Sequence, residues 1–412
     1  MNQSQAFKIL KSKKNIFLTG PAGTGKTFLL NKFIEYSKKR KIKIGITAST
    51  GIAATHIEGR TIHSWSGMGI KDKFTDKEIN ELLKKDKLLA RIRETQVLII
   101  DEISMLDALR FDLLDKICKI AKEPFLPFGG IQIIICGDFF QLQPVDPNNQ
   151  NPTLAYDSRA WKNSDIKICY LDKQFRHKDS EFIKILNNIR NNQVGEDTLI
   201  KLKTRLHKPI ILKMVDPIKL YTHNVDVDAI NIYELSKITG DEFNYEMINY
   251  GSKELVKFLK KNCLAPEHLT LKLGAMVIFI KNNFGQGYVN GTLGKVIDFD
   301  NGGYPIVETE SGDKITVSLA SWNIEEDGKS IASISQIPLR LAWAITVHKS
   351  QGMTIDAAEI DLSKSFAYGM GYVALSRVRT LDSIKLMGIN EMALKVNPKN
   401  IKKDIEFRSL SQ

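Results

Sequence analysis

The sequence predicts an α/β protein built on a parallel sheet, with a separate antiparallel β region in its second half. Short apolar runs at 16–19, 42–47, 97–100 and 131–136 alternate with stretches of helical periodicity. This alternation is typical of parallel strands that are joined by helices. Apolar and polar residues alternate between Gly and Asn/Asp turns over 246–337, which predicts a small antiparallel barrel.

Length and charge limit the possible functions. A chain of 412 residues has room for about two to four domains. Its 59 Lys plus Arg against 47 Asp plus Glu give a formal net charge of +12, which favours a polyanionic partner such as nucleic acid or an acidic membrane surface. The sequence has no apolar run of membrane-spanning length and no apolar signal segment, so we expect a soluble intracellular protein without a membrane partner. The scattered cysteines indicate neither a zinc site nor a disulfide framework.

The most specific motif is GPAGTGKT at 20–27, which lies between the apolar run 16–19 and a stretch of helical periodicity. Its glycines allow the backbone to fold closely around a polyphosphate, which amide N–H groups and the helix dipole then stabilise. We expect Lys26 to contact the β- and γ-phosphates and Thr27 to bind Mg²⁺. The predicted nucleotide-binding residues of this loop are Gly20, Pro21, Ala22, Gly23, Thr24, Gly25, Lys26 and Thr27.

Further catalytic candidates follow two other predicted strands, because ligands bind at the carboxyl ends of parallel strands. Asp101 and Glu102 directly follow the aliphatic run 97–100. We expect Asp101 to hold Mg²⁺ and Glu102 to polarise the attacking water. Gln141 follows the next strand and is expected to contact the γ-phosphate, while the two phenylalanines before it pack in the core.

Eight further blocks of sequence resemble the Pif (petite integration frequency) family of superfamily-one DNA helicases, a group that moves 5′ to 3′. The blocks of the first half are TASTGIAA (47–54), RTIHSWSG (60–67), IIDEISML (99–106) and PFGGIQIIICGDFFQLQPV (127–145). Those of the second half are LDKQFRHKD (171–179), LYTHNVDVDAIN (220–231), LAWAITVHKSQGMTID (341–356) and GYVALSRVRT (371–380). Gln143 and His177 depart from the usual proline and glutamine, which affects only fine geometry.

The resemblance implies two RecA-like parallel-sheet domains with ATP bound between them. The first domain is expected at 1–165, with a small wedge insertion at about 67–94. The second domain is expected at 166–245 and 338–412, interrupted by an SH3-like β-barrel insertion at 246–337. Apolar runs at 218–221 and 341–347 agree with strands of such a second domain.

Resemblance also assigns roles to residues outside the phosphate-binding loop. Gln5 is expected to read the adenine, with Gln3 as the alternative. Arg176 and Arg377 are expected to reach the γ-phosphate when the domains close, whereas Arg379 is less clearly placed. The residues expected to contact DNA phosphates are Thr47, Ser49, Thr50, His63, Ser64, His348, Lys349 and Ser350. Trp65 either stacks on a base or packs in the core.

The sequence therefore predicts an ATP-dependent DNA helicase that moves 5′ to 3′ on single-stranded DNA and unwinds tailed duplex, with G-quadruplex and R-loop DNA as further possible substrates. Its cofactors are expected to be ATP and Mg²⁺. We expect a monomer that acts in DNA repair, recombination and genome maintenance, in the cytoplasm at the bacterial nucleoid or in another soluble intracellular compartment. The alternatives are a RecD- or Dda-type helicase, a single-stranded-DNA-binding ATPase that does not unwind, and an ATPase without a nucleic-acid partner.

Overall fold

A computed structural model describes residues 1–57, 59–69, 73–144, 153–210, 217–281, 283–288, 290–309, 311–326 and 329–411. The chain forms two compact units. Unit 1 consists of Met1–Gln193, Ala367–Ser376 and Leu394–Gln412, and unit 2 consists of Val194–Phe366 and Arg377–Ala393.

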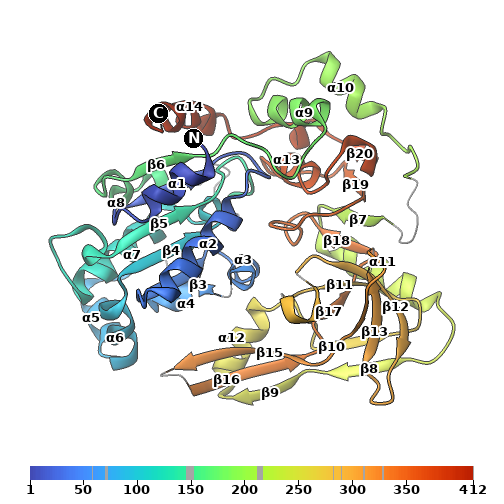
Figure 1. Ribbon diagram of the computed structural model, residues 1–412, viewed down its shortest axis with the longest axis horizontal. Helices are drawn as coiled ribbons and strands as arrows, with labels where there is room; N and C mark the ends of the chain where they lie inside the picture. Colours follow the sequence, from blue (N-terminus) through green and yellow to red (C-terminus); the bar gives the residue numbers. More distant parts are fainter. Residues whose placement is uncertain are drawn as a thin grey trace. The chain divides into compact units, whose positions relative to one another are not determined.

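Unit 1 is built on a six-stranded parallel sheet in the order β3-β2-β4-β5-β1-β6 (Figure 1). The side chains of its central strands are buried, as expected when helices cover both faces of a parallel sheet. The predicted runs therefore form strands, although the second strand begins two residues later than expected. The strands are β1 (Ile16–Thr19), β2 (Ile44–Ala48), β3 (Arg60–Thr61), β4 (Val97–Asp101), β5 (Gln132–Cys136) and β6 (Lys167–Tyr170).

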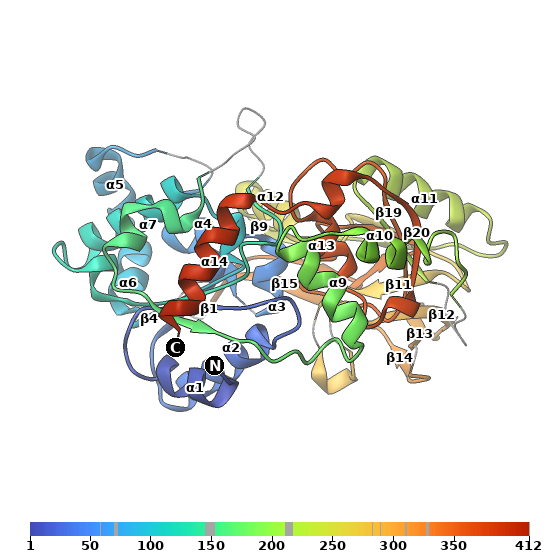
Figure 2. The same ribbon diagram turned by 90° about the horizontal axis from the view of Figure 1, so that it is seen from above.

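Helices of unit 1 cover the two faces of this sheet (Figure 2). Side chains of α1, α2 and α3 pack with Ile16 and Leu18 of β1 on one face. Side chains of α7, α8 and α14 pack with Phe17, the intervening residue, on the other, because successive side chains of a strand point to opposite faces. These helices are α1 (Gln3–Leu10), α2 (Lys26–Lys39), α3 (Gly51–His56), α7 (Ala108–Ala121), α8 (Arg159–Lys162) and α14 (Pro398–Leu410).

The segment expected as a wedge at about 67–94 contains two short helices, α5 (Asp76–Leu83) and α6 (Asp86–Glu94); its residues 70–72 lie outside the described part of the chain. A capping box of Thr75 and Glu78 begins α5, which satisfies free amide groups at the helix start. The apolar faces of both helices join the core of unit 1 through Ile79, Leu83, Leu88 and Ile92. The charged residues of the segment thus belong to the solvent side of two anchored helices.

Unit 1 extends beyond the boundary at 165 that the sequence analysis drew. β6 pairs in parallel with β1, and α14 places Phe407 with its ring centroid 5.1 Å from that of Phe17. Residues 166–193 and two later segments, expected in the second domain, are therefore grouped with the first. Apolar side chains of β6 and α14 are part of its core. These segments carry α9 (Ser180–Arg190), α13 (Met370–Leu375) and α14. The remaining helix of unit 1 is α4 (Ile62–Ser66).

Unit 2 contains a four-stranded parallel sheet in the order β18-β7-β19-β20. Its strands are β7 (Ile218–Tyr221), β18 (Ala344–Thr346), β19 (Ala358–Leu362) and β20 (Ile384–Ile389). The two strands predicted in this half, β7 and β18, are direct neighbours. Asn231 of α11 (Asn224–Ser236) exchanges two hydrogen bonds with the backbone of Ala344. Unit 2 also contains α10 (Glu196–Lys203).

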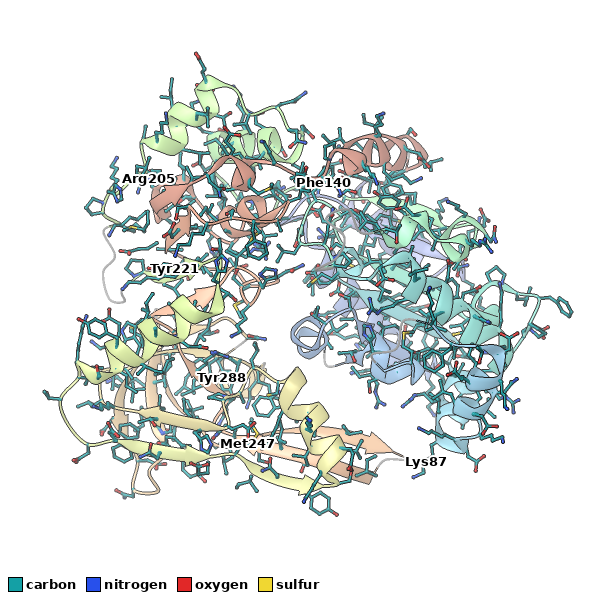
Figure 3. The ribbon with its side chains drawn as sticks, turned by 180° about the vertical axis from the view of Figure 1, so that it is seen from behind. Lys87, Phe140, Arg205, Tyr221, Met247 and Tyr288 are labelled. Atoms are coloured by element: carbon teal, nitrogen blue, oxygen red, sulfur yellow. The ribbon has the colours of Figure 1, made fainter. Side chains whose placement is uncertain are left out.

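The region 246–337 forms antiparallel strands, as its alternating pattern predicts. A five-stranded sheet in the order β14-β13-β12-β11-β17 surrounds an apolar core, in which Tyr288 (Figure 3) stacks on Phe279 with ring centroids 4.2 Å apart. Its strands are β11 (Met276–Phe279), β12 (Leu293–Phe299), β13 (Pro305–Thr309), β14 (Lys314–Thr316) and β17 (Leu339–Leu341). Beside it are β8 (Phe243–Glu246) with β10 (His268–Leu271), and β9 (Ile248–Gly251) with β15 (Ala320–Glu326), β16 (Lys329–Gln336) and α12 (Lys253–Asn262).

Candidate active site

The glycine-rich loop connects β1 to α2 and has backbone angles that require glycine. Gly20, Gly23 and Gly25 have φ angles of 140°, 85° and 78°, in the region that other residues rarely adopt. A Cβ atom on Gly20 would lie 2.2 Å from the carbonyl oxygen of Leu171. Helix α2 then begins at Lys26, so the loop presents its amide groups at a helix N-terminus, where anions bind.

Lys26 lies inside this loop. Its Nζ donates hydrogen bonds to the carbonyl oxygens of Gly20 at 2.7 Å and Pro21 at 3.0 Å. Burial lowers the pKa of Lys26, while the nearby carboxylates of Asp138 and Glu102 act in the opposite direction. An ammonium group held by two neutral carbonyls lacks a direct counter-charge there, and a polyphosphate would supply one.

Asp101 and Glu102 occupy the end of β4, the neighbour of β5. The Asp101 side chain is 5% exposed and accepts the backbone N–H of Glu102 at 2.9 Å, and burial raises its pKa. Glu102 has left-handed backbone angles, φ 50° and ψ 48°, a conformation that costs about 1–3 kcal/mol and recurs at functional sites. The hydroxyl of Thr27 and the carboxylate of Asp101 are hard oxygen donors that suit Mg²⁺, which takes few protein ligands and several from phosphate and water. The described residues contain no cluster of three or more His, Cys, Asp or Glu side chains that could hold a metal ion.

Gln141 follows β5 and is 5% exposed. Its Oε1 atom is buried without a hydrogen-bond partner among the described residues. An unpartnered buried amide oxygen costs about 1–3 kcal/mol, and a donor such as an ordered water would remove that cost. The adjacent Phe139 and Phe140 are buried, which confirms the packing role predicted for them.

A buried polar network that the sequence analysis missed supports the loop from behind. The hydroxyl of Tyr372, in α13, accepts the backbone N–H of Ala22 at 2.9 Å and donates to Asp138 at 3.3 Å. The Asp138 carboxylate also accepts a hydrogen bond from the guanidinium of Arg190 at 3.2 Å. Arg190 is 1% exposed and makes a two-pronged ion pair with Asp404 at 2.9 and 3.1 Å. The network joins the phosphate-binding loop to α9, α13 and α14.

The signals for this network were present but ambiguous. Tyr372 lies in the block GYVALSRVRT, and Asp138 lies in GDFFQLQPV, yet nothing local marks which buried groups pair. The guanidinium of Arg190 also lies over the ring of Phe140, 4.0 Å from its centroid; Figure 3 labels Phe140. Burial of a charge needs several partners at once, and only the fold identifies them.

Arg176 lies in unit 1 beside the phosphate-binding loop, although the sequence analysis assigned it to the second domain. Its backbone N–H donates to the carbonyl of Gly23 at 3.3 Å, and its guanidinium donates to the carbonyl of Ser376 at 2.9 Å. His177, one of the departures from the family pattern, contacts the same Ser376 carbonyl at 3.2 Å. The segment after β6 is therefore fixed to the loop within one unit.

Of the two glutamines considered for the adenine, Gln3 is the one whose side chain lies against the phosphate-binding loop. Gln3 Nε2 lies 3.3 Å from the carbonyl oxygen of Thr24 and 3.5 Å from that of Gly25. The exposed Gln5 instead completes a capping box with Asn2 at the start of α1. The expectation for Gln5 followed motif spacing, whereas the capping role of its side chain decides its orientation.

Arg377 lies in unit 2 and is 2% exposed. Its guanidinium donates to the carbonyl of Met353 at 3.3 Å, and its own carbonyl accepts the N–H of Ile355. Arg379 is exposed and pairs with Asp356 at 3.0 Å. A mostly exposed pair of this kind contributes little, so Arg379 has the solvated role that the sequence left open.

Several polar residues predicted to contact DNA in unit 1 have internal partners. Thr47 is fully buried and donates to the carbonyl of Ile99 at 2.6 Å, and Ser49 donates to the carbonyl of Glu102 at 2.6 Å. Thr50 caps the start of α3 by accepting the N–H of Ala53. The hydroxyls of Thr47 and Ser49 thus donate to backbone carbonyls of β4 and of the residue that follows it.

The block RTIHSWSG also contains both buried and partly exposed residues. Trp65 is 2% exposed and belongs to the core of unit 1, where its indole occupies the space beside Gly45. The structure therefore supports core packing for Trp65 and not base stacking. His63 and Ser64 are half-buried, and the Ser64 carbonyl accepts Arg91 at 3.3 Å.

In unit 2 an aromatic cluster accompanies the residues of the HKSQG block. The ring of His348 stacks on that of Phe366. The Phe366 ring also lies near that of His223, with ring centroids 5.2 Å apart. Phe366 is 50% exposed, and burial together with His223 lowers the pKa of His348. Burial likewise lowers the pKa of Lys349.

Ser350, in contrast, is fully buried and donates to the carbonyl of Val347. An inward-facing hydroxyl of this kind turns the loop and does not offer itself to a phosphate. The exposure of Phe366 could not be predicted, because an isolated phenylalanine carries no sequence signal of exposure.

A strand, a glycine-rich turn and a helix, with an acidic pair at the end of another strand of the same parallel sheet, define a P-loop nucleoside triphosphatase. Comparison with known proteins narrows this class. Residues 2–198 match the profile of the PIF1-like helicases, and residues 254–299 match the DNA helicase Pif1 2B domain. The described residues contain no helix long and apolar enough to cross a membrane.

Whole-chain similarity extends these matches. The chain is 42% identical to the ATP-dependent DNA helicase Pif1 of Psychrobacter sp. over 472 aligned positions, covering all of this chain and 71% of that protein. It spans 71% of the length of that relative and 62% of the length of human PIF1. The chain belongs to the PIF1-like helicase family, and its activity is that of an ATP-dependent DNA helicase.

Solved structures agree in fold. The Pif1 helicase of Candida albicans is 36% identical with a TM-score of 0.83, and the match covers 98% of each chain. The Bacteroides Pif1 in complex with ADP-AlF3 and single-stranded DNA is 32% identical with a TM-score of 0.69, covering 99% of this chain and 96% of that one. These matches confirm the predicted α/β, RecA-like class.

Proposed function

We propose that the chain hydrolyses Mg²⁺-bound ATP to move 5′ to 3′ along single-stranded DNA and to separate tailed duplexes. The observation that carries the proposal is the composition of one site: the phosphate-binding loop, Lys26, the Asp101–Glu102 pair and the unpartnered Gln141 oxygen belong to one unit. The direction rests on family membership.

In the proposed reaction each group has one task. Lys26 leaves the loop carbonyls for the β- and γ-phosphates, and the loop amides hold the remaining phosphate oxygens. Thr27 and Asp101 would hold Mg²⁺, which would neutralise negative charge on the phosphates. Glu102 accepts a proton from the attacking water, which Gln141 orients.

Residues outside the loop complete the nucleotide site in this proposal. Gln3, and not Gln5, reads the adenine, since its amide lies against the loop. Arg176, fixed beside Gly23, stabilises the γ-phosphate from within unit 1. Arg377 reaches the same phosphate only in a closed, ATP-bound state, which would couple hydrolysis to movement on DNA.

The proposed DNA contacts are reduced relative to the sequence prediction. Thr50, His63 and Ser64 in unit 1 and His348 and Lys349 in unit 2 remain, because their side chains are at least partly exposed. Phe366 is added as a surface on which a base stacks, a contact worth about 1–3 kcal/mol. Phosphate contacts by such groups fix position without reading sequence. We further propose that the protein acts as a monomer in DNA repair and recombination, with G-quadruplex or R-loop DNA as additional substrates.

A strand-separation assay with 5′-tailed, 3′-tailed and G-quadruplex substrates tests this proposal. We expect ATP- and Mg²⁺-dependent unwinding of the 5′-tailed and G-quadruplex substrates but not of the 3′-tailed one, and none by Lys26→Ala at equal protein concentration. Unwinding of the 3′-tailed substrate would refute the direction. DNA-stimulated ATP hydrolysis without any unwinding would favour the alternative of a DNA-binding ATPase.

A further inference from the structure

A pocket of unit 1 lies at the edge of the sheet opposite the phosphate-binding loop. Its volume is about 970 Å³, and it is lined by residues at the starts of β1, β4 and β5, among them Asn15, Val97 and Gln132. The phosphate-binding loop follows the other end of β1. The pocket is therefore separate from the residues assigned to ATP and is large enough for a ligand of several residues.

Positive charge dominates the wall of this pocket. Five basic side chains line it, and no carboxylate stands among the described lining residues. The basic residues are Lys11, Lys13, Arg40, Lys41 and Lys122. All five are exposed. The guanidinium of Arg40 lies 4.8 Å from the ring centroid of Tyr36, and Lys11 Nζ lies 5.5 Å from it, so an aromatic face and two cations are held together.

Apolar surface accompanies the charge. The pocket is also lined by Ile42, Leu126 and Pro127. Leu126 is 51% exposed, and Phe125 beside it is 91% exposed. A fully solvated phenylalanine next to a basic pocket is a feature of protein contact surfaces, since large exposed apolar side chains recur where partners bind.

Two of the lysines occupy backbone positions that favour glycine. Lys41 has φ 56° and Lys13 has φ 60°. At the end of α2, Ile42 N–H donates to the Ser37 carbonyl and Lys41 N–H to the Lys38 carbonyl. This is the arrangement in which glycine usually occupies the position of Lys41. Lys13 and Lys41 thus occupy left-handed backbone positions, which cost a residue with a Cβ atom more than they cost glycine. Both lysines line the same pocket.

We propose that this pocket binds an acidic peptide segment of a partner protein that also carries apolar side chains. Carboxylates of the peptide pair with the lysines and Arg40, while its apolar side chains contact Leu126, Pro127 and Phe125. A nucleic-acid backbone would satisfy the charges, but it offers no aliphatic groups to the exposed leucine and proline. Charge complementarity and the mixed aliphatic surface together favour the peptide.

Fluorescence anisotropy with the nucleotide-free full chain tests this proposal. The probe is a short labelled peptide of alternating glutamate and aspartate that ends in leucine and phenylalanine. The test variant is Lys13→Gly with Lys41→Gly, chosen because glycine suits both backbone positions and the melting temperature should stay within about 3 °C. The matched control is Lys399→Ala with Lys402→Ala, which removes the same charge from exposed positions of α14.

We expect saturable binding of the probe, weakened about tenfold in the test variant and unchanged in the control. A peptide of equal charge without leucine and phenylalanine should bind several-fold more weakly. Equal binding by the test and control variants would overturn the proposal. It would also be overturned if a single-stranded or duplex oligonucleotide displaced the probe and lost affinity in the test variant alone, because the pocket would then be a nucleic-acid site.

Discussion

The hydroxyl of Tyr372 provides a direct test of the network behind the phosphate-binding loop. In Tyr372→Phe the N–H of Ala22, itself 4% exposed, loses its partner at 2.9 Å, and Asp138 loses a donor. An unsatisfied buried donor costs about 1–3 kcal/mol. For a unit of this size the melting temperature should fall by about 2–12 °C.

The same change should weaken ATP binding, because the freed Ala22 amide belongs to the loop that surrounds the phosphates. If about 1 kcal/mol of this destabilisation is lost from the free energy of ATP binding, KM for ATP rises about fivefold. The measurements are thermal melting without nucleotide and DNA-stimulated ATPase kinetics.

Tyr156→Phe is the matched control. The Tyr156 hydroxyl is also buried and donates to Asn400 at 2.7 Å, but it does not contact the loop. It should lower the melting temperature by a similar amount and leave KM for ATP unchanged. An unchanged KM in Tyr372→Phe, with a melting temperature like that of the control, would refute the reasoning.

Three further predictions concern single residues. Glu102→Gln should retain ATP binding and reduce turnover by about a hundredfold or more; near-normal turnover would show that another group activates the water. Arg377→Ala should bind ATP normally but lose about a thousandfold of its DNA-stimulated rate, with little rescue by Arg377→Lys; a rate within a few-fold of wild type would exclude an arginine-finger role. Burial alone would raise the pKa of Asp404, but Arg190 and Arg408 hold it below its ordinary value. Its ion pairs therefore stabilise the fold fully above about pH 4 and are lost as the pH falls further. Asp404→Asn should cost about 3 kcal/mol of unfolding free energy at pH 7 and flatten the acid side of the stability curve, which denaturant titrations at several pH values would measure.

Much of the site was predictable because its functional residues lie close together in the sequence. The loop at 20–27 needs glycine for its backbone, lysine for charge and a helix after it, and all three requirements are local. Asp101 and Glu102 were predictable for the same reason, since an aliphatic strand ends where they begin. The rule that ligands bind at the carboxyl ends of parallel strands placed these loops at one edge of the sheet, whereas the strand order came only from the structure.

Other features depended on which distant side chains meet in the folded chain. Gln3 and Gln5 lie two positions apart, and only the capping of α1 shows which of them lies against the loop. From the sequence, Trp65 could equally stack on a base or pack in the core, and its exposure of 2% in the structure indicates the core.

The buried charges show most clearly what could not be predicted from the sequence. Arg190 and Asp404 are 214 positions apart, and each alone resembles a solvated surface residue. A charge can be buried only where several partners converge on it. The sequence by itself determined the local chemistry of the phosphate-binding loop, and tertiary structure alone decided which charged groups support it, because that convergence is a property of the packed chain.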